Sequence, residues 1–411
     1  MFRLEMIKAS AVNQIKSGIH KILTRKFNDV FPNDIYASIL IKPNLNSNMN
    51  ALTGNTTDLR LCAAVVEFLK ERGYRNIMIG EGTNSGFYRN QISVIERLRV
   101  DRLAKFYGIS VKDLNYSDPV RIEFEDGVKA GVAKECIEAD LFINMPKLKT
   151  HFEMGMSVCL KNLMGCLVGQ ENKKKTHQAL AANILNINKK IKPHLHIVDA
   201  IISMEGLGPT RGKPIHTDTI FLGTDPYLID LICAKFASFD DKNIGTLVEA
   251  HRREIIGHQY YNFVNEFNLE SSFHFEPPQP GKIAGFIHSP KRQKYFLAMR
   301  NTKFFNFLCS TEIGGQLLFK TGLRQDVFIE DEMEVSGFSV NREKCSNCTK
   351  CQDYCPVDMK LPDQLEKVDN HCIECLYCFM VCPDKAIEVK GKLGFVSEQL
   401  KQYDSLVRKI T

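Results

Sequence analysis

Short runs of apolar and β-branched residues alternate with helix-like patterns through the first 235 residues of the chain. Parallel strands that are buried on both faces form such apolar runs, and helices that cross back over the sheet fill the intervals between them. The predicted fold class is therefore α/β, with a mostly parallel sheet and crossover helices. The expected strands cover residues 36–41, 76–79, 141–144, 194–198 and 219–222.

Helical patterns fill several of these intervals and the end of the chain. Residues 58–72 carry an apolar stripe at helical spacing, with Gly73 as the stop signal. A second helix is expected over residues 226–236. Residues 291–325 also show a helical and aromatic pattern, and the polar tail 393–411 is expected to form a closing helix.

Each predicted strand leads into a polar cluster at its carboxyl end. In an open parallel sheet these ends share one edge, and ligands bind in the crevice there. The five clusters would then converge on one site, although any single loop is commonly polar. The clusters are Lys42-Pro43-Asn44, Gly80-Glu81-Gly82, Lys147 to His151, Asp199 with Glu205, and Gly223-Thr224-Asp225.

Basic side chains dominate this predicted crevice. Lys147, Lys149 and Lys161 would direct three ammonium groups toward it, which suits a small carboxylate or phosphate substrate. Lysines on an ordinary solvated surface explain the pattern about as well. If the strand ends converge, one pocket should be lined by Lys42, Lys147, Lys149, His151, Lys161 and Asp199.

Histidines and carboxylates in the same region offer acid–base or metal-binding chemistry. His151 and His177, together with Asp199, Glu205 and Asp225, would supply nitrogen and oxygen ligands for a divalent cation. Their spacing matches no compact metal motif, and a polar-loop or core role explains each histidine alone better. The candidate catalytic residues are His151, Lys147, Lys149, Lys161, Asp199 and Glu205.

Eight of the 14 cysteines fall in two runs near the carboxyl end. The runs are Cys345-x2-Cys348-x2-Cys351-x3-Cys355-Pro356 and Cys372-x2-Cys375-x2-Cys378-x3-Cys382-Pro383. This is the spacing of bacterial ferredoxins with two [4Fe–4S] clusters, in which the fourth cysteine of each run binds the other cluster. One cluster would be held by Cys345, Cys348, Cys351 and Cys382, and the second by Cys372, Cys375, Cys378 and Cys355.

Zinc and disulfides explain these runs less well than iron–sulfur clusters do. A tetrahedral zinc site takes four ligands from two cysteine pairs, whereas each run supplies four cysteines by itself. Disulfides require an oxidising compartment. The complete repeat of the spacing, with Pro356 and Pro383 in matching places, favours two [4Fe–4S] clusters.

The 411 residues are long enough for two or three domains. We expect an α/β domain over residues 1–240 and a mixed extension and linker over 241–335. A small α+β, ferredoxin-like two-cluster domain would follow over 336–392, and a tail over 393–411. The first domain would have its core at about 36–240.

Several sequence blocks follow one another in the first domain. They are Ile41-Lys-Pro-Asn44, Glu81-Gly82, Ala139 to His151, Leu160-Lys-Asn-Leu-Met-Gly165, Val198 to Pro209, and Gly223-Thr-Asp225 with Asp230. On these blocks the domain resembles the domain-of-unknown-function family 362, and members that resemble this chain often carry a ferredoxin module at the carboxyl end. The usual pattern has proline after Thr57-Asp58, where this chain has Leu59, although Asp58 can still cap a helix. The resemblance implies an architecture and a candidate site more than a reaction.

Composition and charge narrow the functional classes. The net charge of +6 is modest for this length, and no nucleic-acid motif accompanies it. No stretch has the pattern of a secretory signal or a membrane helix, so we expect a cytoplasmic protein without a membrane partner.

Two hypotheses of function follow from the sequence. In the first, two [4Fe–4S] clusters transfer electrons between a donor or acceptor protein and an anionic substrate in the α/β domain, with one cluster facing the predicted pocket. In the second, the clusters are structural or sensory, and the α/β domain is a non-redox enzyme or a module that binds a metal or an anion.

Overall fold

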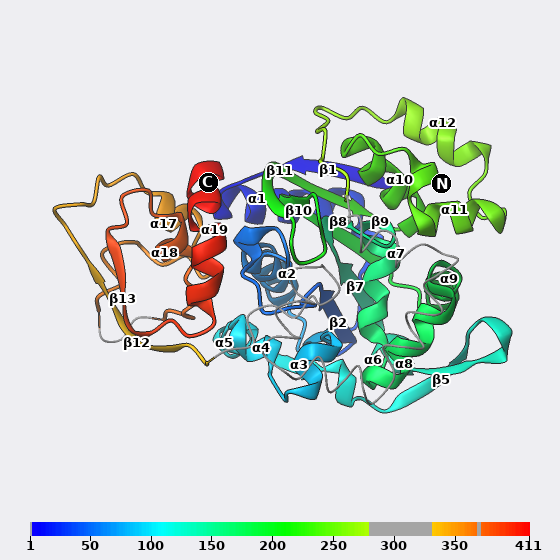
Figure 1. Ribbon diagram of the computed structural model, residues 1–411, viewed down its shortest axis with the longest axis horizontal. Helices are drawn as coiled ribbons and strands as arrows, with labels where there is room; N and C mark the ends of the chain where they lie inside the picture. Colours follow the sequence, from blue (N-terminus) through cyan, green and yellow to red (C-terminus); the bar gives the residue numbers. More distant parts are fainter. Residues whose placement is uncertain (1, 279–330, 368–370) are drawn as a thin grey trace, which may run out of the picture.

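The computed structural model describes residues 2–278, 331–367 and 371–411 (Figure 1). The helical pattern expected over residues 291–325 lies outside the described residues. A nine-stranded sheet forms the centre of the α/β domain, and seven of its strands follow the order β1-β11-β10-β7-β2-β3-β4. The strands of this sheet are β1 (Leu4–Lys8), β2 (Ser38–Pro43), β3 (Asn76–Glu81), β4 (Ser110–Asp113), β7 (Leu141–Met145), β8 (Lys147–His151), β9 (Gly155–Ser157), β10 (Leu195–Glu205) and β11 (Lys213–Gly223).

The middle of the sheet is parallel, as the sequence predicts. Strand β2 pairs in parallel with β3 and β7, β3 with β4, and β7 with β10. After Pro146, β8 continues the path of β7 and pairs in parallel with the second half of β10. These strands are almost wholly buried, which is typical of a sheet covered on both faces.

The expected parallel strand at residues 219–222 is wrong in direction. It forms part of β11, which runs antiparallel to both β10 and β1. Gly223, at the carboxyl end of β11, pairs with His196 near the start of β10. The cluster Gly223-Thr224-Asp225 therefore lies at the opposite edge of the sheet from the other four.

Both predicted helices of the α/β domain are present. Helix α2 (Leu59–Glu71) buries the expected stripe, and Asp58 caps it by accepting a hydrogen bond from the Arg60 N–H. Helix α10 (Pro226–Phe236) begins at the predicted residue and is capped by Asp225. The other helices of this part are α1 (Val12–Lys26), α3 (Ser85–Arg89), α4 (Val94–Arg97), α5 (Val100–Tyr107), α6 (Glu135–Glu138), α7 (Cys159–Asn162), α8 (Gly169–Thr176), α9 (Leu180–Lys190), α11 (Gly245–Arg252) and α12 (His258–Glu266).

A cysteine-rich domain, formed by the described residues from 331 onward, lies at one end of the molecule (Figure 1). Its antiparallel strands β12 (Glu334–Val340) and β13 (Ile387–Lys392) flank the short helices α17 (Lys350–Asp353) and α18 (Tyr377–Val381). Helix α19 (Val396–Ile410) closes the chain and stands between this domain and the α/β domain. A separate hairpin, β5 (Pro119–Glu123) with β6 (Lys129–Ala133), lies on the far side.

The two cysteine runs have matching backbone conformations. The residues on either side of the second cysteine of each run have left-handed φ angles: 55° at Asn347 and 56° at Glu374, and 63° at both Thr349 and Leu376. Non-glycine residues rarely adopt this conformation, so its repetition indicates two loops shaped for the same purpose. In the described part of the chain, no helix is long and apolar enough to span a membrane.

Candidate functional site

Two buried ion pairs join neighbouring strands of the sheet. Nζ of Lys42 on β2 lies 3.0 Å from the carboxylate of Glu81 on β3. Nζ of Lys147 on β8 lies 2.8 Å from Oδ2 of Asp199 on β10. None of these four side chains is more than 3% exposed. Each pair therefore neutralises charges whose separate burial would cost several kcal/mol.

A third buried pair lies where α2 begins. Oδ2 of Asp58 is 2.7 Å from a guanidinium nitrogen of Arg60, and neither side chain is exposed. The backbone N–H of Asp58 donates to Oδ2 of Asp199 at 2.6 Å, which joins this pair to the Lys147–Asp199 pair. Burial opposes ionisation of Asp58, but the Arg60 guanidinium outweighs it and holds the pKa of Asp58 below its ordinary value.

Amide side chains and Lys149 complete the network. Asn162 donates to Oδ1 of Asn144 at 2.7 Å and accepts from Nδ2 of Asn44 at the same distance. Asn44 also accepts a hydrogen bond from Nζ of Lys149 at 2.9 Å. Three of the blocks that carry the family resemblance, far apart in the sequence, are thus joined by hydrogen bonds between their side chains.

His151 and Lys161 lie at the margin of this network. His151 ends β8 and is buried, with Nδ1 accepting the backbone N–H of Glu153 at 3.2 Å. Burial lowers the pKa of His151 well below its ordinary value, and the nearby ammonium groups of Lys161 and Lys149 lower it further. Burial also lowers the pKa of Lys161 to about 8, against the raising effect of Glu153.

The structure brings the six predicted pocket residues into one region, but as a closed network and not as an open pocket. Lys42, Lys147 and Asp199 are fully buried, and Lys149 is 1% exposed. Burial and mutual pairing leave no room for a ligand among the side chains of these four residues. Only Lys161 is half-buried, at the edge of the network.

The carboxylates predicted for a divalent cation are spread over the molecule. Glu205 accepts the backbone N–H of Glu276 at 2.9 Å, and Asp225 caps α10 and accepts the hydroxyl hydrogen of Tyr260. Asp199 is occupied by Lys147. Among the described residues, no three His, Cys, Asp or Glu side chains are placed to hold a single metal ion.

Gly165 packs its backbone directly against the Lys42–Glu81 pair. A Cβ added at Gly165 would lie 1.9 Å from Oε1 of Glu81 and 2.8 Å from Nζ of Lys42, so the pair would have to separate. We expect Gly165→Ala to lower the free energy of unfolding by about 2 kcal/mol, as overpacking of a core does. Urea unfolding would measure the loss. Gly257→Ala is the control, because Gly257 has a φ of −113° and a Cβ there would meet only the movable end of the Gln259 side chain. An unchanged midpoint for Gly165→Ala would contradict the close packing.

The cysteines of the first run group with the last cysteine of the second. The pKa of Cys351 is raised to about 11, chiefly by burial and in part by the sulfurs of Cys348, Cys382 and Cys345. Such coupling between thiols requires that they lie close together. These four cysteines are the first predicted set, and we name it the outer set because Cys348 is exposed.

The remaining four cysteines group in the same crossed manner. Burial raises the pKa of Cys375 well above its ordinary value, with further effects from Cys372 and Cys355. The sulfurs of Cys375, Cys372 and Cys355 act on Cys378, and that of Cys351 in the outer set acts on it as well. We name these four cysteines the inner set. A [4Fe–4S] cube takes one cysteine for each iron, so its ligands surround four irons and do not converge on a single ion.

Backbone N–H groups point at the cysteine sulfurs in matching positions. The N–H of Met359 donates to Sγ of Cys355 at 3.4 Å, and that of Ala386 donates to Sγ of Cys382 at 3.3 Å. Hydrogen bonds to the sulfurs are one of the features that set the reduction potentials of iron–sulfur clusters. The crossed sets, the repeated loop conformation and these hydrogen bonds together fit two cubes.

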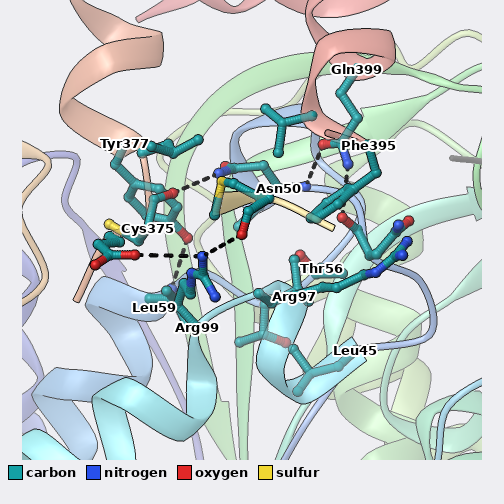
Figure 2. Close-up of a pocket in the computed structure, with 18 residues that line it drawn as sticks. Leu45, Asn50, Thr56, Leu59, Arg97, Arg99, Cys375, Tyr377, Phe395 and Gln399 are labelled. Atoms are coloured by element: carbon teal, nitrogen blue, oxygen red, sulfur yellow. Dashed lines mark hydrogen bonds and ion pairs between the residues drawn. The ribbon is translucent and has the colours of Figure 1, made fainter. Parts of the chain in front are cut away.

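The inner set faces the α/β domain at a junction of direct hydrogen bonds (Figure 2). The hydroxyl of Tyr377 accepts the backbone N–H of Leu59 at 3.1 Å, at the start of α2. Nδ2 of Asn50 donates to the backbone oxygen of Cys375, also at 3.1 Å. Gln399 of α19 accepts the backbone N–H of Asn50 at 3.0 Å.

A small pocket lies inside this junction. It has a volume of about 20 Å³, enough for about one water molecule, and its lining comes from both domains. Arg99, Cys375 and Tyr377 line it together with Asn50 and Leu59 (Figure 2). The pocket is too small for a substrate.

Comparison with known proteins identifies both parts of the chain. Residues 338–389 match a 4Fe–4S dicluster domain. The chain is an iron–sulfur protein. Residues 39–235 match the family described as domain of unknown function (DUF362), so the fusion that the sequence resembles is confirmed.

Two individual proteins show more limited likeness. A thylakoid-associated protein of Synechocystis is 26% identical over 235 residues, which are 52% of this chain and 67% of that protein. The lactate racemase apoprotein of Thermoanaerobacterium thermosaccharolyticum is 14% identical, with a TM-score of 0.39 over 57% of each chain. The chain thus spans little more than half the length of that racemase.

Several residues of the junction have no signature in the sequence. Arg60 stacks on the ring of Tyr354 with a separation of 4.0 Å from the ring centroid, and Tyr377 and Asn50 make the hydrogen bonds described above. Arg60 occupies an apolar helix, where a cation usually faces solvent. Its burial is explained by the pair with Asp58 together with the docking of the second domain.

Proposed function

We propose that the cysteine-rich domain holds two [4Fe–4S] clusters and exchanges electrons between a donor or acceptor protein and an anionic substrate held by the α/β domain. When bound, clusters of this type supply one-electron transfer. The observation that supports the proposal most is the junction, where Tyr377 and Cys375 are hydrogen-bonded to the segment from Asn50 to Leu59. The same segment supplies the oxygen of Asn55 to Lys149.

The two cysteine sets differ in exposure in a way that suggests a direction. Cys348 of the outer set is exposed, whereas Cys355 and Cys378 of the inner set are each 7% exposed. A protein partner would therefore meet the outer set first. The inner set borders the α/β domain, so it would exchange electrons with the substrate that this domain holds. We place this function in the cytoplasm, where reducing conditions keep cysteine thiols free.

The buried ion pairs hold the two domains in register. Asp58 orients Arg60 against the ring of Tyr354, while the adjacent Leu59 N–H binds Tyr377. Asp199, which is paired with Lys147, holds the backbone of Asp58 through the 2.6 Å hydrogen bond. These residues position the domains, and none of them is free to bind substrate.

The alternative function is a non-redox module that binds an anion, with structural or sensory clusters. The closed and paired network at the strand ends favours it, because such a network stabilises a fold without any chemistry. Replacement of Cys348 by alanine distinguishes the two. If the protein transfers electrons, loss of the outer cluster should stop electron exchange with a protein partner. Under either function, the α/β domain should bind its ligand as before.

Anaerobically purified protein is expected to contain about eight irons and about eight acid-labile sulfides per chain. The measurement is a colorimetric iron and sulfide assay, together with electron paramagnetic resonance of the dithionite-reduced protein. Cys62→Ser is a suitable control because Cys62 is a buried residue of α2, outside both sets, and its iron content should match that of the wild type. Stoichiometric zinc without sulfide would overturn the proposal.

A further inference from the structure

The buried network carries more positive than negative charge. Its three carboxylates, Asp58, Glu81 and Asp199, are each paired with one cation, namely Arg60, Lys42 and Lys147. Lys149 is 1% exposed and, in the described part of the chain, makes no ion pair with a carboxylate. A buried cation without a counter-charge is unfavourable, so its presence requires an explanation.

The surroundings of Lys149 match the protonated amine. Its Nζ lies 2.9 Å from Oδ1 of Asn44, 2.8 Å from Oδ1 of Asn46 and 2.7 Å from the backbone oxygen of Asn55. An ammonium group has three N–H donors for these three acceptors, whereas a neutral amine has two. Burial and the neighbouring ammonium groups of Lys161 and Lys147 lower the pKa of Lys149 well below its ordinary value, whereas the three acceptors favour the protonated form.

Two unsatisfied donors lie beside this charge. Nδ1 of His151 accepts the Glu153 N–H, so the neutral ring carries its proton on Nε2. Neither that Nε2–H nor Nζ of Lys161 makes a hydrogen bond to any residue that the structure describes. Both groups can only donate in these states, so the position favours a ligand that accepts hydrogen bonds and carries negative charge.

We propose that His151 and Lys161 form the binding site of an oxyanion, a carboxylate or a phosphate group, whose charge is balanced by the buried Lys149 beneath it. This inference rests on the proposed function and gives it a substrate class and a place. It also separates the predicted lysines by role. Lys42 and Lys147 are neutralised by carboxylates within the fold. Lys149 supplies positive charge near the anion, and Lys161 donates a hydrogen bond to it.

The position of Lys161 suits this role. It is the third residue of α7 (Cys159–Asn162), and the next residue, Asn162, is fixed by hydrogen bonds to Asn44 and Asn144. The backbone N–H groups of Cys159 and Leu160 are both held by the buried carboxylate of Asp230. The segment that carries Lys161 is therefore rigid, which lowers the entropic cost of holding a ligand.

Isothermal titration calorimetry of the anaerobic holo-protein with sodium phosphate and with sodium acetate, at ionic strength matched with sodium chloride, tests the site. We expect one of the two anions to bind, and Lys161→Gln to weaken it by about ten- to a hundredfold, as loss of a charged hydrogen bond does. Lys161→Arg should restore most of the affinity. Lys174→Gln is the matched control, because Lys174 lies nearby on α8 but is solvent-exposed and paired with Glu171.

The outcomes separate this inference from the proposed function. Binding of phosphate alone assigns a phosphate group, and binding of acetate assigns a carboxylate. Failure of both anions to bind, or equal binding by wild type and Lys161→Gln, overturns the site. Iron content and reduction by dithionite are measured on the same samples, and these results test the electron-transfer proposal independently of anion binding. Unchanged visible absorption of Lys161→Gln shows that the variant is folded and loaded.

Discussion

Replacement of Asp58 by alanine is expected to lower the free energy of unfolding by about 4 kcal/mol. The variant leaves the guanidinium of Arg60 buried without its carboxylate, because neither side chain has any exposure. It also removes the cap of α2 and the contact that orients Arg60 on the ring of Tyr354.

Chemical unfolding of the holo-protein under anaerobic conditions measures this loss. Asp58→Asn keeps an acceptor for the cap and removes the charge, so its stability should lie between those of wild type and Asp58→Ala. Asp118→Ala is the matched control, since its pair with Lys134 is solvent-exposed and should leave the midpoint unchanged. If Asp58→Ala and Asp118→Ala behaved alike, the buried pair would not stabilise the fold.

The parallel core of the sheet could be predicted because its strands are short apolar runs separated by helices. The direction of the strand at residues 219–222 could not be predicted, because a short apolar run is compatible with parallel and with antiparallel pairing. The expected strands 194–198 and 219–222 left room for a crossover, which needs a dozen or more residues. In the structure β10 extends to Glu205 and β11 starts at Lys213, and the short connection between them permits only an antiparallel pair.

The sequence predicted which residues of the candidate site lie together better than it predicted which of them form ion pairs. The rule that strand ends share an edge placed Lys42, Lys147, Lys149 and Asp199 together, and they are together. Whether each lysine meets a carboxylate depends on side-chain geometry across strands, which periodicity does not contain. Glu81 neutralises Lys42 across the sheet, and no pattern in the sequence distinguishes that lysine from Lys149, which stays unpaired by any described carboxylate.

The role of the junction could not be predicted, because its contacts join residues more than 300 positions apart. The Leu59 N–H meets the hydroxyl of Tyr377, and Asn50 meets the backbone of Cys375. The cysteine spacing fixes which sulfurs share a cluster, but it contains no information on which cluster faces the other domain. That assignment to the inner set comes only from the packing of α18 and α19 against the loop that precedes α2 (Figure 1).

Loss of a cluster is therefore expected to have unequal consequences for the two sets. Cys375→Ser removes a ligand at the junction, whose backbone oxygen binds Asn50 and whose side chain lines the pocket between the domains. Cys348→Ser removes an exposed ligand of the outer set. A bound group stabilises the folded state by its binding free energy, and only the inner group would transmit that stability to the α/β domain. We expect Cys375→Ser to cost about 2 kcal/mol more stability than Cys348→Ser.

Thermal unfolding followed by circular dichroism, with limited proteolysis across the segment between the domains, compares the two variants. Each should retain about half of the iron. Cys375→Ser should show an earlier transition and faster cleavage, because the contacts of Tyr377 and Cys375 with α2 and Asn50 weaken when the inner loop loses its cluster. Cys348→Ser should keep both properties near those of the wild type. Equal destabilisation by the two variants would show that the junction does not depend on the inner set, and the electron path through it would lose its structural basis.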